Sequence, residues 1–318
     1  MKLVFCGTPQ FAVPTLESLV SVGHEIALVV TQPDRPQGRG LELATSPVKQ
    51  TALQHSLLIT QPERIKDNTE FREQLEQIAP EAIIVVGYGR IIPPWMLGLP
   101  RLGNINLHAS LLPKYRGAAP IQWAIAAGET ITGVTTMLLN EGLDTGDILL
   151  QRELPIALED TAVTLAPRLA TVGAALMLET LQRLQAESIA AISQDHSRAT
   201  LAPILKREDG LIDFSRPAEA IVNRLRGFQP WPGAYTFFRG KKLAVLEAKA
   251  VEGSKLNPGT INVEAGRIRV GCGNRTTLEL VSIQLEGKKR TSTEEFVRGY
   301  RVQLDEELGQ IASKEASS

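Results

Sequence analysis

Asn106 and His108 are the residues whose types and spacing best suit chemistry in this 318-residue sequence. They lie in a predicted strand, 103–108, where side chains alternate between faces, so both point to the same side. The Asn106 amide can donate a hydrogen bond to an oxygen that becomes negative during attack on a carbonyl. The His108 imidazole can take the proton of an attacking amine. The pair therefore indicates acyl-type transfer, with a purely structural role as the alternative.

A carboxylate that orients the imidazole is predicted at Asp144. This residue lies in the turn-rich segment 141–147, between the predicted strands 132–140 and 148–154. The alternative is a role in the turn alone, because Leu-Asp-Thr-Gly-Asp suits tight turns. No serine or cysteine has the setting of a nucleophile, and no His-rich or acidic pattern indicates a metal. We therefore expect direct transfer to a nucleophile, without a covalent enzyme intermediate and without a metal.

The first half of the chain alternates between predicted strands and helices. The strands are expected at 2–6, 26–31, 82–86 and 103–108, and the helices at 11–22, 69–78, 120–127 and 161–185. Strands that are apolar on both faces and separated by helices predict a parallel sheet covered on both sides. Ligands bind at the carboxyl ends of such strands, where Asn106 and His108 would lie. The predicted fold class is α/β, with a doubly wound, Rossmann-like first domain.

The second half has shorter predicted strands separated by glycine-rich turns. They are expected at 234–238, 243–248, 260–263, 267–270 and 277–284, between predicted helices at 217–228 and 293–301. Several short strands of this kind predict a small, OB-like β-barrel. The predicted domains are therefore 1–189 and 207–318, joined by an irregular linker at 190–206.

Charge and composition restrict the possible partners. Residues 206–302 hold 18 Lys and Arg against 11 Asp and Glu, whereas residues 1–205 hold 15 against 20. The basic second half favours an anionic partner there, with simple surface scatter as the alternative. The apolar runs are short and no leader pattern opens the chain, so we expect a cytoplasmic protein without a membrane partner. Cys6 and Cys272 lack partner spacing and are expected to be buried free thiols.

Three segments carry a resemblance to a known family: Asn106–Pro113, Arg116–Gln122 and Leu143–Asp147. In order and spacing they resemble the core signature of the formyltransferases that depend on 10-formyltetrahydrofolate. The resemblance implies that Asn106, His108 and Asp144 form the catalytic trio, in which an amine attacks the formyl carbon of the co-substrate.

The same resemblance implies where the co-substrate, 10-formyltetrahydrofolate, would bind. Its pocket would be lined by four consecutive residues, Ser110, Leu111, Leu112 and Pro113. The family includes enzymes that formylate glycinamide ribonucleotide, amino sugars or aminoacyl-tRNA, and hydrolases that deformylate the folate. The rest of the chain must therefore indicate the acceptor.

The segment 31–49 is rich in proline and glycine and resembles an insertion found in one branch of the family. In the branch that acts on initiator methionyl-tRNA, this insertion grips the acceptor end of the tRNA. Arg35 and Arg39 lie among glycines and are predicted to approach phosphates closely. A flexible surface connection is the alternative. Leu41 and Glu42 stand where the family often has lysine after Gly-Arg-Gly.

The second domain also resembles that branch. Residues 228–233 are similar to its Asn-Pro-Trp-Pro turn, with Gln229 in place of asparagine, and Trp231 is interpreted as a rigid hydrophobic corner. The predicted phosphate contacts of this domain are Lys206, Arg224, Arg226 and the run 288–290.

The resemblance as a whole implies a monomeric enzyme. It would transfer the formyl group of 10-formyltetrahydrofolate to the α-amino group of methionine on initiator methionyl-tRNA. The alternatives are an amino-sugar nucleotide formyltransferase and a non-catalytic protein that binds tRNA or folate.

Overall fold

The structure, a computed structural model, describes residues 1–37, 42–253 and 255–309, without the side chains of 36–43. The chain forms two compact units. Unit 1 comprises Met1–Ile121, Ile131–Ile156 and Thr164–Pro203, and unit 2 comprises Gln122–Thr130, Ala157–Val163 and Ile204–Ser318. The predicted boundaries, 1–189, 190–206 and 207–318, did not anticipate that two short stretches of the first half would group with unit 2, and they stay predictions.

The described residues of unit 1 contain a seven-stranded sheet with the order β5-β2-β1-β6-β7-β8-β9. Its strands are β1 (Lys2–Gly7), β2 (Glu25–Val30), β5 (Ile59–Thr60), β6 (Ala82–Val86), β7 (Asn104–His108), β8 (Ile131–Leu138) and β9 (Ile148–Pro155). From β5 to β7 the neighbouring strands are parallel, which confirms the doubly wound prediction. β8 and β9 are antiparallel to their neighbours, so the sheet is mixed. A short connection is sufficient between antiparallel neighbours such as β8 and β9.

Helices pack on both faces of this sheet. The helices are α1 (Val13–Ser21), α2 (Pro47–Gln54), α3 (Thr69–Ile78), α4 (Pro94–Leu97), α5 (Pro120–Ala126) and α6 (Ala162–Gln185). Phe71 of α3 and Met96 of α4 share one buried cluster with Val4 of β1. On β7, Leu107 faces α6, because a Cβ at Gly173 would lie 2.7 Å from Leu107 Cδ2. Asn106 and His108 therefore face away from α6.

Helix α6 is long and apolar enough to cross a membrane by length and composition alone. Its buried residues, which include Leu165, Leu169 and Met177, lie in the interior of the protein. A core helix passes the same test, so this feature by itself assigns no membrane role.

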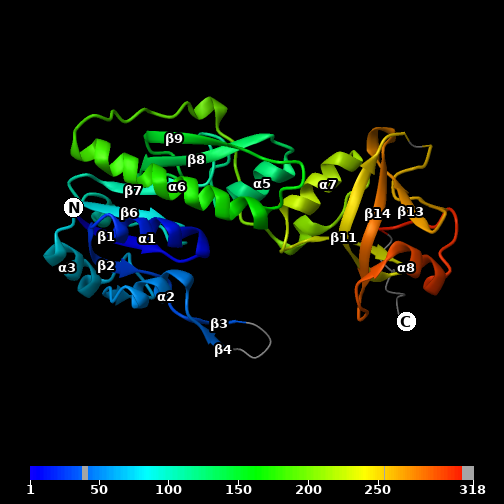
Figure 1. Cartoon of the computed structure of the whole chain (residues 1–318), viewed down its shortest axis with the longest axis horizontal. Helices are drawn as coiled ribbons and strands as arrows, with labels where there is room; N and C mark the ends of the chain where they lie inside the picture. Colours follow the sequence, from blue (N-terminus) through cyan, green and yellow to red (C-terminus); the bar gives the residue numbers. More distant parts are fainter. Residues whose placement is uncertain (38–41, 254, 310–318) are drawn as a thin grey trace, which may run out of the picture. The chain divides into compact units, whose positions relative to one another are not determined.

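The segment 31–49 is more ordered than the loop expected from its sequence. β3 (Arg35–Gln37) and β4 (Glu42–Ala44) pair as an antiparallel ribbon, which extends from unit 1 in Figure 1. Lys49 holds the base of this ribbon through Asp34 at 2.5 Å and Gln61 at 2.7 Å. The predicted contact Arg39 lies outside the described residues.

Unit 2 contains a five-stranded antiparallel path with the order β10-β11-β14-β13-β12. Its elements are α7 (Ala218–Gly227), β10 (Ala234–Phe238), β11 (Lys241–Val251), β12 (Ile261–Glu264), β13 (Arg267–Gly271), β14 (Thr277–Leu285), β15 (Thr291–Ser292) and α8 (Thr293–Tyr300). β15 adds to β14, and α7 and α8 contribute Ile221 and Phe296 to the buried core. The predicted strands were close to those observed.

The segment after α8 links the two edge strands of this sheet. Ile261 on β12 donates its N–H to Glu306 O at 2.7 Å, and Gly309 donates its N–H to Phe237 O on β10 at 3.0 Å. Arg239 adds an ion pair with Glu306 at 2.6 Å. Both edges are thereby covered, and the unit has the barrel-like character that the sequence predicted.

Candidate functional site

The carboxyl end of β7 carries the predicted catalytic amide and imidazole. Asn104, Asn106 and His108 lie on one face of the strand and are each less than a tenth exposed. Asn104 Nδ2 is satisfied by the carbonyls of Met96 and Leu97, at 2.9 and 3.1 Å. Asn106 differs, because its side chain has no hydrogen bond with any residue that the structure describes. The amide atoms of Asn106 are not among those fully shielded from solvent, so they can hydrogen-bond a ligand that reaches this end of the strand.

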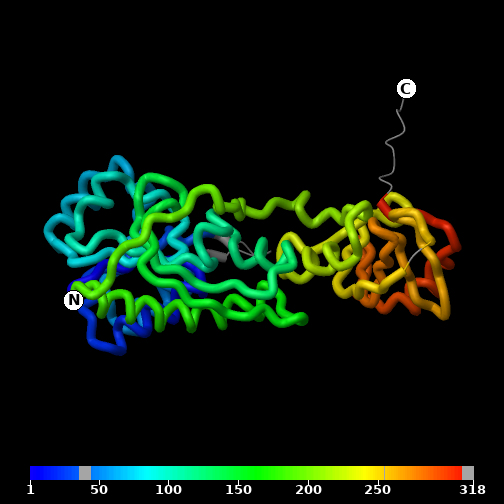
Figure 2. Tube along the Cα trace, turned by 90° about the horizontal axis from the view of Figure 1, so that it is seen from above, coloured from blue at the N-terminus to red at the C-terminus, as the bar shows by residue number. Residues whose placement is uncertain are grey.

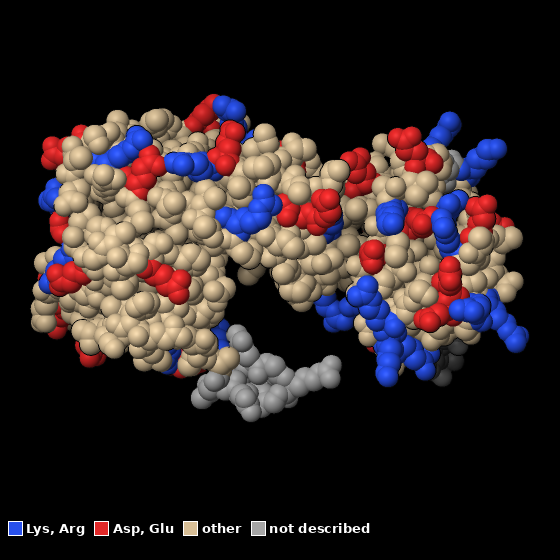
Figure 3. Space-filling view, in the orientation of Figure 1, with Lys and Arg blue, Asp and Glu red and all other residues tan. Residues whose placement is uncertain are grey.

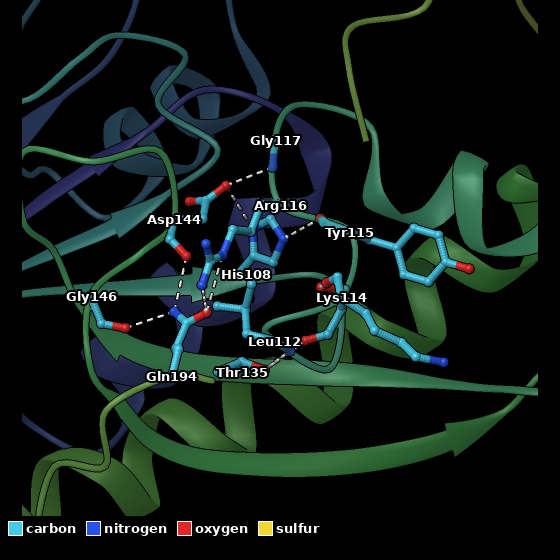
Figure 4. A network of polar contacts seen from close by, with 11 residues as sticks. His108, Leu112, Lys114, Tyr115, Arg116, Gly117, Thr135, Asp144, Gly146 and Gln194 are labelled. Carbon is cyan, nitrogen blue, oxygen red and sulfur yellow. Dashed lines mark hydrogen bonds and ion pairs between the residues drawn. The ribbon is translucent and has the colours of Figure 1, made fainter. Parts of the chain in front are cut away.

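His108 is held by contacts on both ring nitrogens (Figure 4). Its Nε2 lies 2.9 Å from Tyr115 O, and because a carbonyl can only accept, Nε2 carries the hydrogen. Its Nδ1 lies 3.6 Å from Asp144 Oδ2. In the neutral ring Nδ1 therefore has its lone pair available to take a proton. The imidazolium that results would face a carboxylate on one side and a carbonyl on the other.

Asp144 lies between β8 and β9, close to His108 as the sequence predicted. Its backbone has a φ of 50°, a strained value for a residue with a side chain. Its Oδ2 accepts the N–H of Gly117 at 2.8 Å, which aims the carboxylate. Gly117 itself has a φ of 120°, and a Cβ there would lie 2.7 Å from Ala202 O. Glycine is thus required at the position that donates to Asp144.

The segment predicted to line the folate pocket follows β7 directly. Ser110 is fully buried and donates to Lys114 O at 2.6 Å, so its hydroxyl serves the local turn. Leu112 is also buried, whereas Leu111 and Pro113 are partly exposed. The structure thus leaves Leu111 and Pro113 as the members of the predicted set that a ligand can reach.

Two residues behind this segment fix its path. Thr135 Oγ1 donates to Ser110 O at 2.6 Å and accepts the Leu112 N–H at 3.1 Å. Gln151 Nε2 donates to Leu112 O and to Thr135 Oγ1, both at 2.9 Å. Sequence reasoning missed both, because a threonine and a glutamine inside predicted strands give no signal of such contacts.

A third missed residue is Gln194, in the segment predicted to be a linker. Figures 1 and 2 show the chain after α6 running back along unit 1. Gln194 in this segment is buried and contacts both Arg116 and the Asp144 loop. Irregular sequence gave no indication that this stretch belongs to the site.

The residues predicted to contact tRNA fall into different environments. Arg35 and Lys206 are exposed. Arg226 is partly buried in unit 2, where it donates to Asp160 O and Asn223 Oδ1, both at 2.7 Å. Burial lowers the pKa of the Arg226 guanidinium.

Arg224, another predicted contact, also has partners inside unit 2. Its guanidinium lies over the rings of Phe228 and Trp123, at 4.7 and 5.5 Å from their centroids. By contrast Trp231, interpreted from sequence as a hydrophobic corner, is 55 % exposed.

Comparison with known proteins decides the family. Residues 1–181 match the family described as formyl transferase, and residues 204–301 match the formyl transferase C-terminal domain. Methionyl-tRNA formyltransferase of Koribacter versatilis is 63 % identical over 98 % of this chain and 100 % of its own. The enzymes of Acidobacterium capsulatum and Solibacter usitatus are 60 % and 52 % identical, over 97 % and 98 % of this chain and 100 % and 99 % of their own. The chain belongs to the methionyl-tRNA formyltransferases.

Solved structures share the fold at much lower identity. An N-formyltransferase from Helicobacter canadensis, in complex with folinic acid and dTDP-3-aminofucose, has a TM-score of 0.66 at 18 % identity. The match covers 88 % of this chain and 98 % of that one. HypX from Aquifex aeolicus, in complex with tetrahydrofolic acid, has a TM-score of 0.61 at 16 % identity, over 96 % of this chain and 48 % of that one. These likenesses support the fold alone.

Proposed function

We propose that this protein transfers a formyl group from 10-formyltetrahydrofolate to the α-amino group of methionine on initiator methionyl-tRNA. The observation that carries the proposal is the end of β7. There the Asn106 amide has no partner among the described residues and is not fully shielded from solvent, and the adjacent His108 faces Asp144. A group that donates to an oxyanion, a base and a carboxylate are the parts that direct acyl transfer to an amine requires.

In the proposed mechanism, the residues stabilise charge and move one proton. The co-substrate supplies the formyl carbon. Asn106 donates an Nδ2 hydrogen to the formyl oxygen as the amine nitrogen forms its bond to carbon and the oxygen becomes negative. His108 takes the proton of the attacking amine at Nδ1 and returns it to the departing nitrogen. Asp144 stabilises the imidazolium between these two steps.

The co-substrate fits beside β7 in this proposal. Leu111 and Pro113 are partly exposed and offer an apolar edge in the segment that directly follows β7. The backbone of this segment is fixed from behind by Thr135 and Gln151. A segment whose backbone is already fixed suits a flat ligand, because binding then costs little conformational entropy.

Exposed cations in both units support a tRNA acceptor. Arg35 begins the β3–β4 ribbon, and Figure 3 shows Lys and Arg side chains at several places on the surface of unit 2, among Asp and Glu. On unit 2, Lys242 Nζ lies 4.0 Å from the Tyr235 ring centroid, and both are only partly buried. An aromatic side chain beside a cation suits contact with a base and its phosphate.

The excess of positive charge in the second half is local. Within the bounds of unit 2 the sequence holds 19 Lys and Arg against 18 Asp and Glu, so the unit as a whole is nearly neutral. Several of its cations are paired, as Arg269 is with Glu264 and Glu279. A tRNA contact would therefore depend on particular exposed cations such as Lys206. A cytoplasmic location and a monomeric state stay predictions.

The test offers purified protein radiolabelled 10-formyltetrahydrofolate and three acceptors. They are methionyl initiator tRNA, free methionine and an amino-sugar nucleotide. We expect label on the charged tRNA alone, with a rate that falls steeply as salt rises, because phosphate contacts release counterions. Label on the sugar nucleotide would retain the chemistry and overturn the acceptor. Absence of label from all three would overturn the proposal.

A further inference from the structure

We propose that Gln194 is a positioning residue that holds Asp144 against His108, which makes the segment 190–203 part of the catalytic centre. This inference rests on the proposed function. It assigns a role to a stretch that the sequence presented as a linker. The buried side chain of Gln194 forms four hydrogen bonds that support this role.

The Gln194 amide donates both of its hydrogens to the loop that carries Asp144. Its Nε2 lies 2.9 Å from Asp144 O and 2.7 Å from Gly146 O (Figure 4). Asp144 has a positive φ, and a conformation of this kind persists only where its surroundings hold it. One amide group therefore fixes the backbone on which the catalytic carboxylate stands.

Arg116 holds the other end of the same amide. Its Nε and one terminal nitrogen donate to Gln194 Oε1, at 3.2 and 2.6 Å. Arginine can only donate and the two loop carbonyls can only accept, so a single orientation of the amide satisfies all four contacts. Gln194 cannot rotate without losing them.

Arg116 is itself firmly placed. It is buried, its N–H donates to Thr200 O at 2.8 Å, and its carbonyl accepts the Ala202 N–H at 2.7 Å. No described carboxylate forms an ion pair with its guanidinium, which instead contacts Gln194 and His196 Nδ1. A buried cation strengthens the hydrogen bonds that it donates.

The two residues before Gln194 also form contacts that place it beside the Asp144 loop. Ile192 and Ile148 exchange backbone hydrogen bonds, both at 2.8 Å, at the start of β9. Ser193 Oγ donates to Asp147 Oδ1 at 2.9 Å. Three consecutive residues, Ile192, Ser193 and Gln194, therefore hydrogen-bond the chain between Asp144 and Ile148. Gln194 is the buried one of the three.

The main test is Gln194→Glu, which keeps an acceptor for Arg116 and removes both hydrogens that reach the loop. We expect kcat to fall by about 10- to 100-fold, because small displacements of a catalytic group have effects of this size. We expect the KM values for folate and tRNA to stay within about threefold, since neither substrate contacts Gln194 in this proposal. Gln194→Met is the second variant. Gln182→Glu is the matched control, because Gln182 is an exposed glutamine outside the segment 190–203, and it should match the wild type.

A double-mutant cycle separates positioning from general stability. If Gln194 acts through Asp144, then Gln194→Glu in an Asp144→Asn background should lower kcat further by less than about twofold. An equal loss in both backgrounds, or a loss confined to folate KM, would overturn the inference. So would wild-type kcat in both Gln194 variants. Failure of the wild-type enzyme to formylate any acceptor would instead refute the proposed function.

Discussion

The proposed catalytic centre of unit 1 and the proposed tRNA contacts are built in opposite ways. Beside Asp144, Arg116 and Gln194 are buried, and Gln194 is fixed by four hydrogen bonds. Arg35 and Lys206 are exposed. Transition-state stabilisation needs groups that are placed before the reaction begins. Contacts with phosphates tolerate long and mobile side chains.

This difference predicts different consequences for single substitutions. In the buried network one lost contact displaces its neighbours, so effects should be large and non-additive. On the surface each cation acts nearly alone, and effects should be small and dependent on salt. Five further substitutions test the contrast, from the largest expected effect to the smallest.

The first substitution is His108→Ala. We expect turnover to fall by about 10²–10⁴-fold, the usual range for loss of a general acid–base, with tRNA affinity unchanged. Single-turnover formylation and a separate tRNA-binding titration would measure the two effects. His55→Ala removes an exposed imidazole and serves as control. Near-normal turnover in His108→Ala would remove His108 from the mechanism.

The second substitution is Gly117→Ala. The new methyl group would meet Ala202 O at 2.7 Å on a backbone with φ 120°, so the N–H that binds Asp144 must move. We expect kcat to fall by about 10- to 100-fold and stability to fall by about 1–3 kcal/mol. Enzyme kinetics and urea unfolding would measure these losses.

Gly23→Ala is the matched control for backbone strain. Gly23 has a φ of 82°, but a Cβ there would meet nothing within 4 Å. It should lower stability and leave kcat unchanged. Equal kcat in Gly117→Ala and wild type would show that the Gly117 hydrogen bond is dispensable.

The sequence predicted the placement of the candidate groups better than it predicted the residues that support them. Asn106 and His108 share a face because strand alternation is a local rule, and the structure places Asp144 beside His108. Residues that act through long-range hydrogen bonds leave no such pattern. Gln194 reaches Gly146, 48 positions earlier, from a stretch without regular structure.

Some elements of the fold were also predicted well from the sequence, and others were not. β6 and α3 were predicted to the residue, because a short apolar run determines the first and helical hydrophobic periodicity the second. The β3–β4 ribbon was taken for a loop, since Pro36 and the surrounding glycines are typical of turns. The antiparallel pairing of β8 depends on contacts with β7 that periodicity does not encode.

The third substitution is Thr135→Val, which keeps the side-chain shape and removes the hydroxyl. Two hydrogen bonds to the segment predicted to line the folate pocket and one to Gln151 are lost, and the Leu112 N–H is left without its partner. We expect a loss of about 1–3 kcal/mol of stability. We also expect weaker folate binding, by about 3- to 10-fold, with a smaller change in kcat. Fluorescence titration with folate would measure the affinity.

Thr15→Val provides the control for this substitution. Thr15 is fully buried, and its hydroxyl has no partner among the residues that the structure describes. Replacing it should be neutral or stabilising. Unchanged folate affinity in Thr135→Val would mean that the segment keeps its path without this hydroxyl.

The smallest effects are expected for Arg35→Ala and Arg39→Ala, made singly. Each should raise the KM for tRNA by about 3- to 10-fold and leave folate affinity unchanged. Each should also reduce the slope of log KM against log salt by about one, because one phosphate contact is lost. Arg101→Ala, at another exposed arginine, should change neither quantity.

A fall in kcat at saturating tRNA would contradict the proposed difference between the buried network around Asp144 and the exposed cations. It would mean that these arginines also help to place the reacting groups. A KM change that persists at high salt would exclude phosphate contact and would favour recognition of bases by this ribbon.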